Sequence, residues 1–323
     1  MGNKSVSYQH VYQNTVDGVL LFYDSIDRIV FFTILSVLSE RYGVKIIAIS
    51  LMPDHYHLLV EADGRYRIVN FIRTLNSVYA KAFNRTMNRR GRLFNRRFGC
   101  APKKTTKEII TTVNYILNNP LVKFLDEKVE NSPWNYLAYS LKKNPFSERL
   151  TPDSIGRNLL NAMKYVATQK EDEHWLTYAG LNKASKGLND SEFSQLVDYI
   201  ISSYYKIDYC GASVFFGGMD KMITAANYNS GAEYGIGEVF EVKDDRLYNA
   251  MRDILESKYE MKDVKNVFFI EADKRLKIAV DIQEMLHIPA RQVEKYMQLK
   301  DGTLYRKTEH LVRVRNHYRH LPQ

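Results

Sequence analysis

Two short apolar runs separated by one turn constrain the fold of this chain more than any other feature. Residues 44–51 form a β-branched apolar run, residues 55–62 form a second apolar run, and a Pro-Asp dipeptide that favours a turn lies between them. The pattern predicts two consecutive strands. Because side chains alternate between the two faces of a strand, His55 and His57 project from the same face of the second strand. Two imidazoles placed in this way are close enough to share a divalent metal ion.

The flanking segments predict an alternating order of strands and helices. Asp24-Ser25 is a helix-capping pattern, and Gly43 is suited to the end of the helix that follows. In chain order we expect strands at residues 5–13, 44–51, 55–62 and 91–99, and helices at 26–41, 66–87 and from 106 onward. This order is typical of an α+β fold, specifically a ferredoxin-like βαββαβ sandwich with one added helix.

The added helix carries a tyrosine and an amide in a pattern suited to chemistry. Thr105 and Glu108 form a capping box at its start, and Pro120 lies near its end. Tyr115 and Asn119 are four residues apart, so they share one face of the helix. A phenol and an amide beside a histidine pair can make a metal-assisted nucleophile.

The charge balance suggests a partner that is acidic. The chain has 46 Lys and Arg against 37 Asp and Glu, and nucleic acid is the first candidate for such an excess of positive charge. Residues 81–107 contain ten basic residues and no acidic one, interleaved with Phe83, Phe94 and Phe98. A solvated face is the ordinary explanation of a charge run, but such a face is usually balanced by acids. We therefore expect this segment to bind phosphates and to stack on unpaired bases.

The predicted DNA contacts of this segment lie within the strand expected at residues 91–99 and on both sides of it. They are Arg85, Arg89, Arg90, Arg92, Arg96, Arg97, Lys103 and Lys104. On such a strand Arg92, Phe94 and Arg96 would share one face.

The length of 323 residues favours more than one unit. We expect a first domain at residues 1–145, a linker or helical region of unknown role at 146–244, and a helical region at 245–323. Residues 274–286 and 290–299 have the spacing of a helix-turn-helix, in which Arg291 and Lys295 would contact duplex DNA. An ordinary helical hairpin explains the same pattern. The tail after residue 305 adds further basic residues.

Cysteine usage and apolar patterning predict a cytoplasmic protein that is not in a membrane. Cys100 and Cys210 are far apart in the sequence and have no zinc-type spacing, which is typical of two reduced thiols. No signal peptide is visible, and the most apolar stretch, residues 29–38, is too short to cross a bilayer.

Four segments in a consistent order resemble a known family. They are Met52–Val60 with its His-Tyr-His triplet, the Arg-rich segment Gly91–Phe98, Tyr115–Pro120, and Ser132–Tyr136 with its Pro-Trp pair. Together, residues 5–140 resemble the HUH single-tyrosine transposases, in particular those associated with repetitive extragenic palindromes. The resemblance does not extend to the residues after 146.

The resemblance implies a chemistry for each of these residues. His55, His57 and Asn119 would hold a divalent metal ion, Mg²⁺ or Mn²⁺, and Tyr115 would attack the scissile phosphate to form a covalent 5′-phosphotyrosine. The implied partners are single-stranded DNA hairpins with their flanking DNA. Some relatives are dimers and others act alone, so the resemblance leaves both a homodimer and a monomer open. Tyr56, between the histidines, would point to the opposite face of the strand and into the core.

Two other functions stay open from the sequence. One is a non-catalytic DNA-binding protein that recognises palindromic elements, and the other is a nickase of the replication-initiator or relaxase type. The joint presence of a nucleophile and three candidate ligands favours the enzyme.

Overall fold

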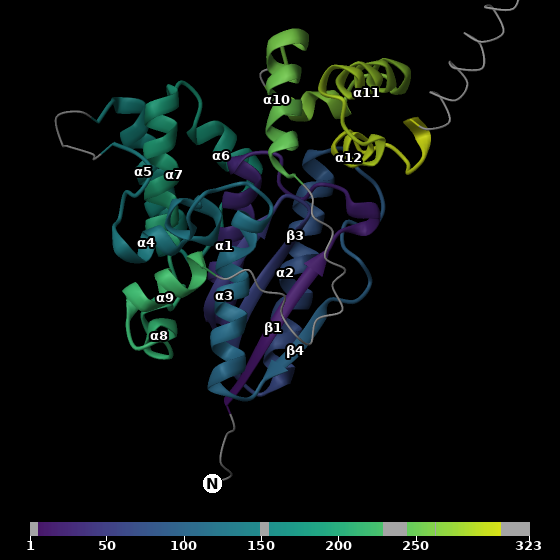
Figure 1. Ribbon diagram of the computed structural model, residues 1–323. Coiled ribbons are helices and arrows are strands. Elements are labelled where there is room, and N and C mark those ends of the chain that lie inside the picture. The colour runs from purple at the N-terminus through teal and green to yellow at the C-terminus, as the bar shows by residue number, and fades with distance from the viewer. Residues whose placement is uncertain (1–5, 149–154, 229–243, 262, 305–323) are drawn as a thin grey trace, which may run out of the picture.

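A four-stranded antiparallel sheet forms the centre of the N-terminal part of the chain (Figure 1). The structure is a computed structural model that describes residues 6–148, 155–228, 244–261 and 263–304. The strands are β1 (Val6–Asn14), β2 (Val44–Met52), β3 (His55–Asp63) and β4 (Gly99–Lys103), in the spatial order β2-β3-β1-β4. Each neighbouring pair is antiparallel, and the β2–β3 hairpin is the one predicted from the two apolar runs.

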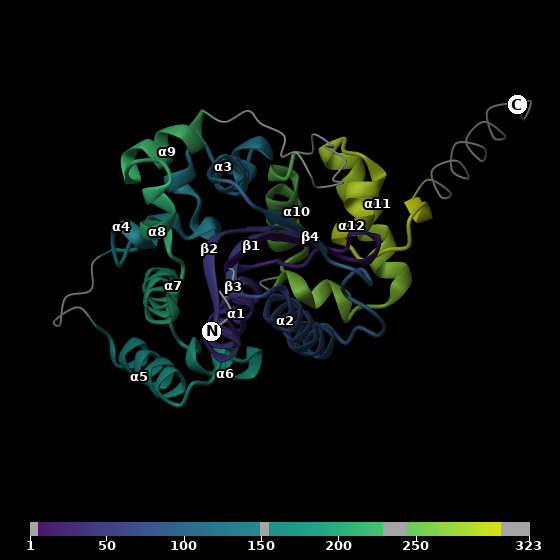
Figure 2. The same cartoon turned by 90° about the horizontal axis from the view of Figure 1, so that it is seen from below.

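Helices cover both faces of the sheet. Helices α1 (Ser25–Tyr42) and α2 (Arg65–Thr86) pack on one face, and α3 (Thr106–Val122) lies on the other, as Figure 2 shows. The predicted ends of these helices are present: Asp24 caps α1, Gly43 adopts the left-handed conformation after it, and Thr105 and Glu108 form the capping box of α3. The ferredoxin-like α+β sandwich with an added helix is therefore confirmed.

Tyr56 lies in the core between the sheet and α1 and α2. Its side chain is fully buried, its ring centroid is 4.9 Å from that of Phe31, and its hydroxyl donates to Asn76 Oδ1 at 2.7 Å. Tyr56 therefore points to the face opposite to the histidines, as the alternation predicted.

The fourth strand is not where the sequence placed it. Residues 91–98 are an irregular segment, and β4 begins only at Gly99. Leu93 and Phe94 are adjacent and both buried, which a strand with one solvated face does not allow. Main-chain bonds from Val16 to Leu93 and from Asn95 to Asn14 hold the segment against the end of β1.

Gly99 allows a tyrosine of β1 to lie across β4. Tyr12 is paired directly with Gly99, and a Cβ at residue 99 would overlap the Tyr12 ring. We expect Gly99→Ala to lower the free energy of unfolding by about 1–3 kcal/mol, because the ring must move to make room. Urea denaturation measures the effect.

Gly156→Ala is the matched control for this substitution. A Cβ there would meet only the flexible end of Glu192. In both variants alanine lowers the conformational entropy of the unfolded chain. If the two substitutions change the free energy of unfolding by the same amount, the position of the Tyr12 ring does not depend on Gly99.

The segment after α3 folds back onto α1. It includes the short helices η2 (Val129–Asn131), η3 (Pro133–Asn135) and α4 (Leu137–Leu141). Tyr136 is fully buried, and its ring is stacked on Phe32 with centroids 4.3 Å apart. The segment therefore belongs to the core of the N-terminal part.

The middle region is helical and packs directly on the sheet domain. It contains α5 (Arg157–Glu171), α6 (Tyr178–Ala184), α7 (Asp190–Tyr204), α8 (Tyr209–Val214) and α9 (Met219–Asn227). Helix α7 contacts α1, and α9 contacts α3. Ile207 forms a parallel bridge with Ile46, and the Asp208 amide donates to the Ile46 carbonyl at 2.8 Å, so this region covers the outer edge of β2.

The C-terminal region has the predicted pair of helices. It contains α10 (Arg246–Tyr259), the short helix η5 (Val264–Phe268), α11 (Ala272–Leu286) and α12 (Ala290–Tyr296). The spacing that suggested a helix-turn-helix core corresponds to buried side chains, namely Ala279, Ile282, Ile288, Val293 and Met297. The basic tail predicted after residue 305 lies outside the described residues.

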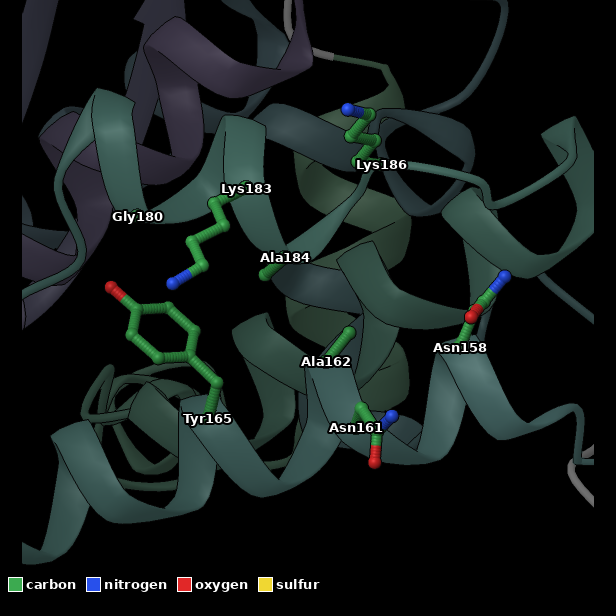
Figure 3. Close-up of a pocket in the computed structure, with 8 residues that line it drawn as sticks. All are labelled: Asn158, Asn161, Ala162, Tyr165, Gly180, Lys183, Ala184 and Lys186. Carbon is green, nitrogen blue, oxygen red and sulfur yellow. The ribbon is translucent and has the colours of Figure 1, made fainter.

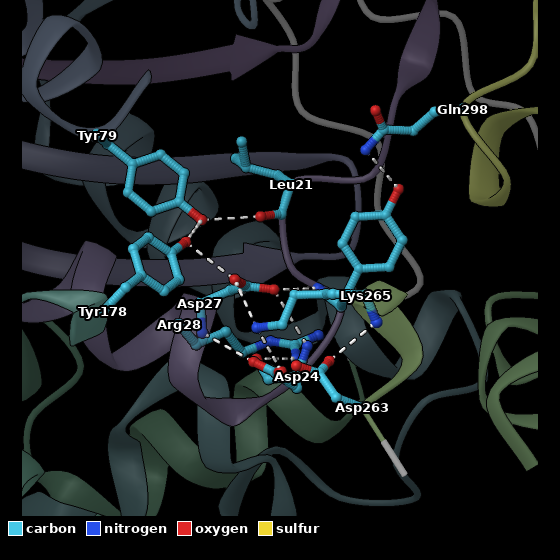
Figure 4. A network of polar contacts seen from close by, with 10 residues as sticks. Leu21, Asp24, Asp27, Arg28, Tyr79, Tyr178, Asp263, Lys265 and Gln298 are labelled. Carbon is cyan, nitrogen blue, oxygen red and sulfur yellow. Dashed lines mark hydrogen bonds and ion pairs between the residues drawn. The ribbon is translucent and has the colours of Figure 1, made fainter. Parts of the chain in front are cut away.

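A buried polar network joins the C-terminal region to the start of α1 (Figure 4). Lys265 Nζ is 2.6 Å from Asp24 Oδ2 and 3.3 Å from Asp27 Oδ1, and Tyr178 of α6 donates to Asp27 Oδ1 at 2.9 Å. Burial is the main cause that raises the pKa of Asp27 to about 6, and repulsion from Asp24 adds to it. The network therefore ties the N-terminal, middle and C-terminal parts together at one point.

The helices of the described ranges do not include one with the length and apolar character of a membrane span.

Candidate active site

The two histidines of β3 lie on the sheet face that α3 covers. The ring centroids of His55 and His57 are 5.0 Å apart, and the ring planes are perpendicular. His57 is fully buried, and His55 is 9% exposed. The strand alternation therefore produces the predicted pair.

Asp54 orients the first histidine. Asp54 Oδ1 is 2.6 Å from His55 Nδ1. A carboxylate at this position favours the tautomer with the proton on Nδ1, which leaves the Nε2 lone pair available to a metal ion. The turn predicted at the Pro-Asp dipeptide therefore also brings a carboxylate to the histidine.

His10 is a third histidine of the site that the sequence analysis missed. His10 Nε2 lies 3.1 Å from His57 Nδ1, and His10 is fully buried on β1. The register places His10 opposite Leu59 and His57 opposite Tyr12, so the two histidines are diagonal neighbours on one face. The only signal in the sequence was a histidine within a predicted strand, and pairing between strands decides whether it meets another.

His57 is held in its neutral form. Burial lowers the pKa of His57 well below its usual range, and electrostatic interactions with His55, His10 and Lys123 act in the same direction. Neutral imidazole is the form that binds a metal ion.

Tyr115 meets this histidine cluster from α3. Its ring centroid is 5.3 Å from that of His57 and 5.8 Å from that of His10. The capping box at Thr105 and Glu108 fixes the start of α3, and contacts with β2, β3 and α9 fix its direction. Tyr115 is only 5% exposed, so side chains near it must move before its phenol can meet any ligand from solvent.

The two neighbouring asparagines of α3 have different surroundings. Asn118 Nδ2 donates to the Ala226 carbonyl of α9 at 2.8 Å, which ties α3 to the middle region. Asn119 is 5% exposed, and its Nδ2 has no hydrogen-bond partner within the described residues. Asn119 shares the helical face of Tyr115, whereas the bond to Ala226 gives Asn118 a structural role.

Tyr12 is a second tyrosine near the histidines. Its ring is stacked beside His57 with centroids 6.2 Å apart, and its side chain is half-buried. The sequence analysis did not single it out, because its position depends on the β1–β3 register. Tyr12 is therefore the competitor of Tyr115 for the role of nucleophile.

The basic segment presents most of its charges to solvent. The exposed side chains are Arg85, Arg90, Arg92, Arg96, Arg97 and Lys104, whereas Arg89 is half-buried and Lys103 is buried. The expectation that Arg92, Phe94 and Arg96 share one face was wrong, because residues 91–98 do not form a strand.

The predicted stacking residues of this segment are mainly core residues. Phe94 contacts Tyr56 and Tyr79, and Phe83 is fully buried. Phe98 is half-buried, so of the three phenylalanines it is the one with surface left for a base.

The two residues predicted to read duplex DNA differ in their surroundings. Arg291 is exposed on α12. Lys295 has a side chain that is 8% exposed, and its Nζ lies 3.7 Å from Asp54 Oδ2. In this arrangement Lys295 points toward the histidine site, away from any surface where α12 could meet a duplex.

The predicted ligands have the chemistry of a divalent metal site. The carboxylate-bound His55, the neutral His57 and the amide of Asn119 supply nitrogen and oxygen donors on facing elements. The described residues contain no group of three or more His, Cys, Asp or Glu side chains that could hold a metal ion. A site here would therefore depend on the amide as its third protein ligand.

Two surface cavities lie away from the histidines. One of about 400 Å³ lies between α5 and α6, where the lining side chains include Asn158, Tyr165 and Lys183 (Figure 3). The other, of about 390 Å³, is lined by Asp24, Lys265 and their neighbours. Neither is lined by a predicted site residue.

Comparison with known proteins finds a family that is similar to the part of the chain with His55, His57 and Tyr115. Residues 18–119 match the family model described as "Transposase IS200 like". This part of the chain, less than half of its length, is similar to IS200-like transposases. The match includes His55, His57, Tyr115 and Asn119, so the matched segment contains all the predicted ligands and the predicted nucleophile.

One solved structure and the curated proteins complete the comparison. The chain is similar to a REP-associated tyrosine transposase bound to a REP hairpin, with 17% identity and a TM-score of 0.35, over 47% of this chain and 91% of that one. No curated protein matches the chain.

Proposed function

We propose that this protein is a metal-dependent enzyme that nicks and rejoins single-stranded DNA at hairpin sites through a covalent 5′-phosphotyrosine. The observation that supports it is that the ring centroids of Tyr115 and His57 are 5.3 Å apart. Both residues lie in the segment that matches the IS200-like transposase family. A nucleophile beside neutral imidazoles is unusual for a protein that only binds DNA.

The residues of the site have separate roles in this proposal. Tyr115 Oη bonds to the phosphorus, the phenol loses its proton, and the bond to the 3′ oxygen breaks so that a 3′-hydroxyl is released. That hydroxyl can attack the phosphotyrosine in reverse, so rejoining needs no ATP. Asp54 and His10 orient His55 and His57 through the bonds at 2.6 Å and 3.1 Å.

A divalent ion, Mg²⁺ or Mn²⁺, would be held by His55, His57 and Asn119. When bound, it polarises the phosphate and neutralises charge that develops in the transition state. The low exposure of Tyr115 means that DNA binding must also open this face of α3.

The direct test uses labelled single-stranded hairpins taken from the DNA that flanks the gene. The protein is incubated with each hairpin and Mn²⁺ or Mg²⁺, and the reaction is separated under denaturing conditions. We expect a protein–DNA band that survives denaturation. A relaxase-type nickase would also cut strands without a hairpin, and a binding protein would give no such band. The cytoplasmic location stays a prediction.

The exposed arginines of the segment at 91–98 should supply phosphate contacts. We expect replacement of Arg92, Arg96 and Arg97 by Gln to weaken hairpin binding. The slope of the logarithm of the binding constant against the logarithm of the salt concentration should also become smaller by about two units, because each lost phosphate contact contributes about 0.7. Titrations at several salt concentrations measure the slope.

A triple variant with the same loss of charge serves as the control. Lys164, Lys183 and Lys186 are exposed in the middle region, and their replacement by Gln should leave the slope unchanged. An equal fall in both variants would mean that net charge, and not this segment, determines binding. The homodimer stays a prediction, which sedimentation of the free and hairpin-bound protein would test.

A further inference from the structure

A lysine of the C-terminal region reaches the histidine site through one carboxylate. Lys295 Nζ is 3.7 Å from Asp54 Oδ2, and the other oxygen of that carboxylate, Oδ1, is 2.6 Å from His55 Nδ1. The side chains of Lys295 and Asp54 are only 8% and 18% exposed. Asp54 therefore connects α12 to a candidate metal ligand that is remote from α12 in the sequence.

The N-terminal part leaves room for this lysine. Gly18 has a φ of +68°, and a Cβ there would lie 2.5 Å from Lys295 Cε and 2.7 Å from Nζ. Hydrogen bonds fix the end of α12 in the same place: Tyr23 donates to the Tyr296 carbonyl at 3.0 Å, and Gln298 donates to the Tyr23 hydroxyl at 3.2 Å. Several separate contacts therefore fix the position of α12.

The ion pair affects what Asp54 can do for the histidine. Lys295 contacts one oxygen of the Asp54 carboxylate, which keeps the other oxygen directed at His55 Nδ1. Such outer partners set the tautomer and the ring direction of a ligating histidine, and their loss usually lowers metal affinity by about 10–100-fold.

We infer that Lys295 is a positioning residue, which prepares His55 for metal binding by holding Asp54. The inference rests on the proposed function for the metal site itself. It assigns the C-terminal region a role in completing that site, in addition to any contact that this region makes with DNA.

The test measures Mn²⁺ binding to the full-length protein by the loss of the free-Mn²⁺ electron paramagnetic resonance signal. We expect Lys295→Met to weaken Mn²⁺ binding about 10-fold, and Lys295→Arg to restore most of it. The direction of the change in Mn²⁺ affinity is decisive. A lysine that acted only as a nearby positive charge would repel the ion, so its removal would strengthen binding.

Lys258→Met is the matched control. Lys258 Nζ is also 3.7 Å from a carboxylate, that of Asp281, but both side chains are about half exposed and lie elsewhere in the C-terminal region. This variant should bind Mn²⁺ like the unmodified protein.

A double variant separates positioning from general damage to the fold. Asp54→Asn should weaken Mn²⁺ binding at least as much as Lys295→Met, and the combination should be no weaker than Asp54→Asn alone, because Lys295 acts through Asp54. Additive losses would overturn the inference. If Lys295→Met does not fold by circular dichroism, Lys295→Gln replaces it in the same cycle.

The outcomes for the inference and for the proposed function are distinct. If the unmodified protein forms the covalent hairpin adduct but Lys295→Met binds Mn²⁺ equally well, the inference fails and the function stands. If no adduct forms but Lys295→Met still weakens Mn²⁺ binding, the function fails and the inference stands. An unmodified protein that does not bind Mn²⁺ overturns the inference.

Discussion

Tyr115→Phe is expected to lower covalent adduct formation by roughly 10³-fold or more while hairpin affinity stays within about threefold. The substitution removes one oxygen from a ring that is 5.3 Å from His57 and keeps the packing of α3. Adduct formation is measured on denaturing gels in single-turnover reactions, and affinity is measured separately by fluorescence anisotropy. Loss of both would indicate damage to the fold and not loss of the nucleophile.

Two further tyrosines serve as comparisons for this variant. Tyr12→Phe removes the hydroxyl of the half-buried competitor that is stacked beside His57, and Tyr66→Phe does so at a side chain that is 76% exposed on α2. Both should keep most of the adduct. If Tyr12→Phe abolishes it and Tyr115→Phe does not, the nucleophile is Tyr12, and α3 has only a structural role in the site.

His57→Gln is expected to lower adduct formation by at least about 100-fold and to weaken Mn²⁺ binding to a similar extent. His57 is a buried, neutral imidazole whose Nδ1 is already engaged by His10 at 3.1 Å. An amide in its place cannot reproduce both the bond to His10 and the nitrogen donor. Removal of metal with EDTA should have the same effect on the unmodified protein, and added Mn²⁺ should reverse it.

His174→Gln is the control for the loss of a histidine. His174 is exposed and belongs to the middle region, so its replacement should change neither Mn²⁺ binding nor the adduct. An adduct that forms at full rate in EDTA would contradict the metal-dependent function directly, even if Tyr115 proved to be the nucleophile.

The sequence predicted the regular part of the fold because each of those elements has local causes. Strand β3 is a short apolar run that follows a turn, α1 has a capping aspartate and a terminal Gly43, and α3 has a capping box. These signals depend on residues within a few positions of one another. They also predicted the pairing of His55 with His57, and the shared helical face of Tyr115 and Asn119.

The error at the fourth strand has a physical reason. The basic segment before Gly99 is richer in large side chains than β4 itself, whose sequence is Gly-Cys-Ala-Pro-Lys. Such a strand has little intrinsic preference for extended structure and exists because β1 offers an unpaired edge, where Pro102 is tolerated. The sequence shows propensity, whereas the pairing with β1 decided the position of the strand.

The sequence by itself determined the pair His55 and His57, the helix that carries Tyr115, and the ferredoxin-like order of strands and helices. Short-range periodicity and capping specify these features. Only the tertiary structure decided that His10 meets His57, that Tyr12 lies beside them, and that Lys295 reaches Asp54. These contacts join residues on separate elements, and their geometry follows from strand register and from the docking of α12. No local pattern encodes either of these, because many registers and docking positions are compatible with the same local propensities.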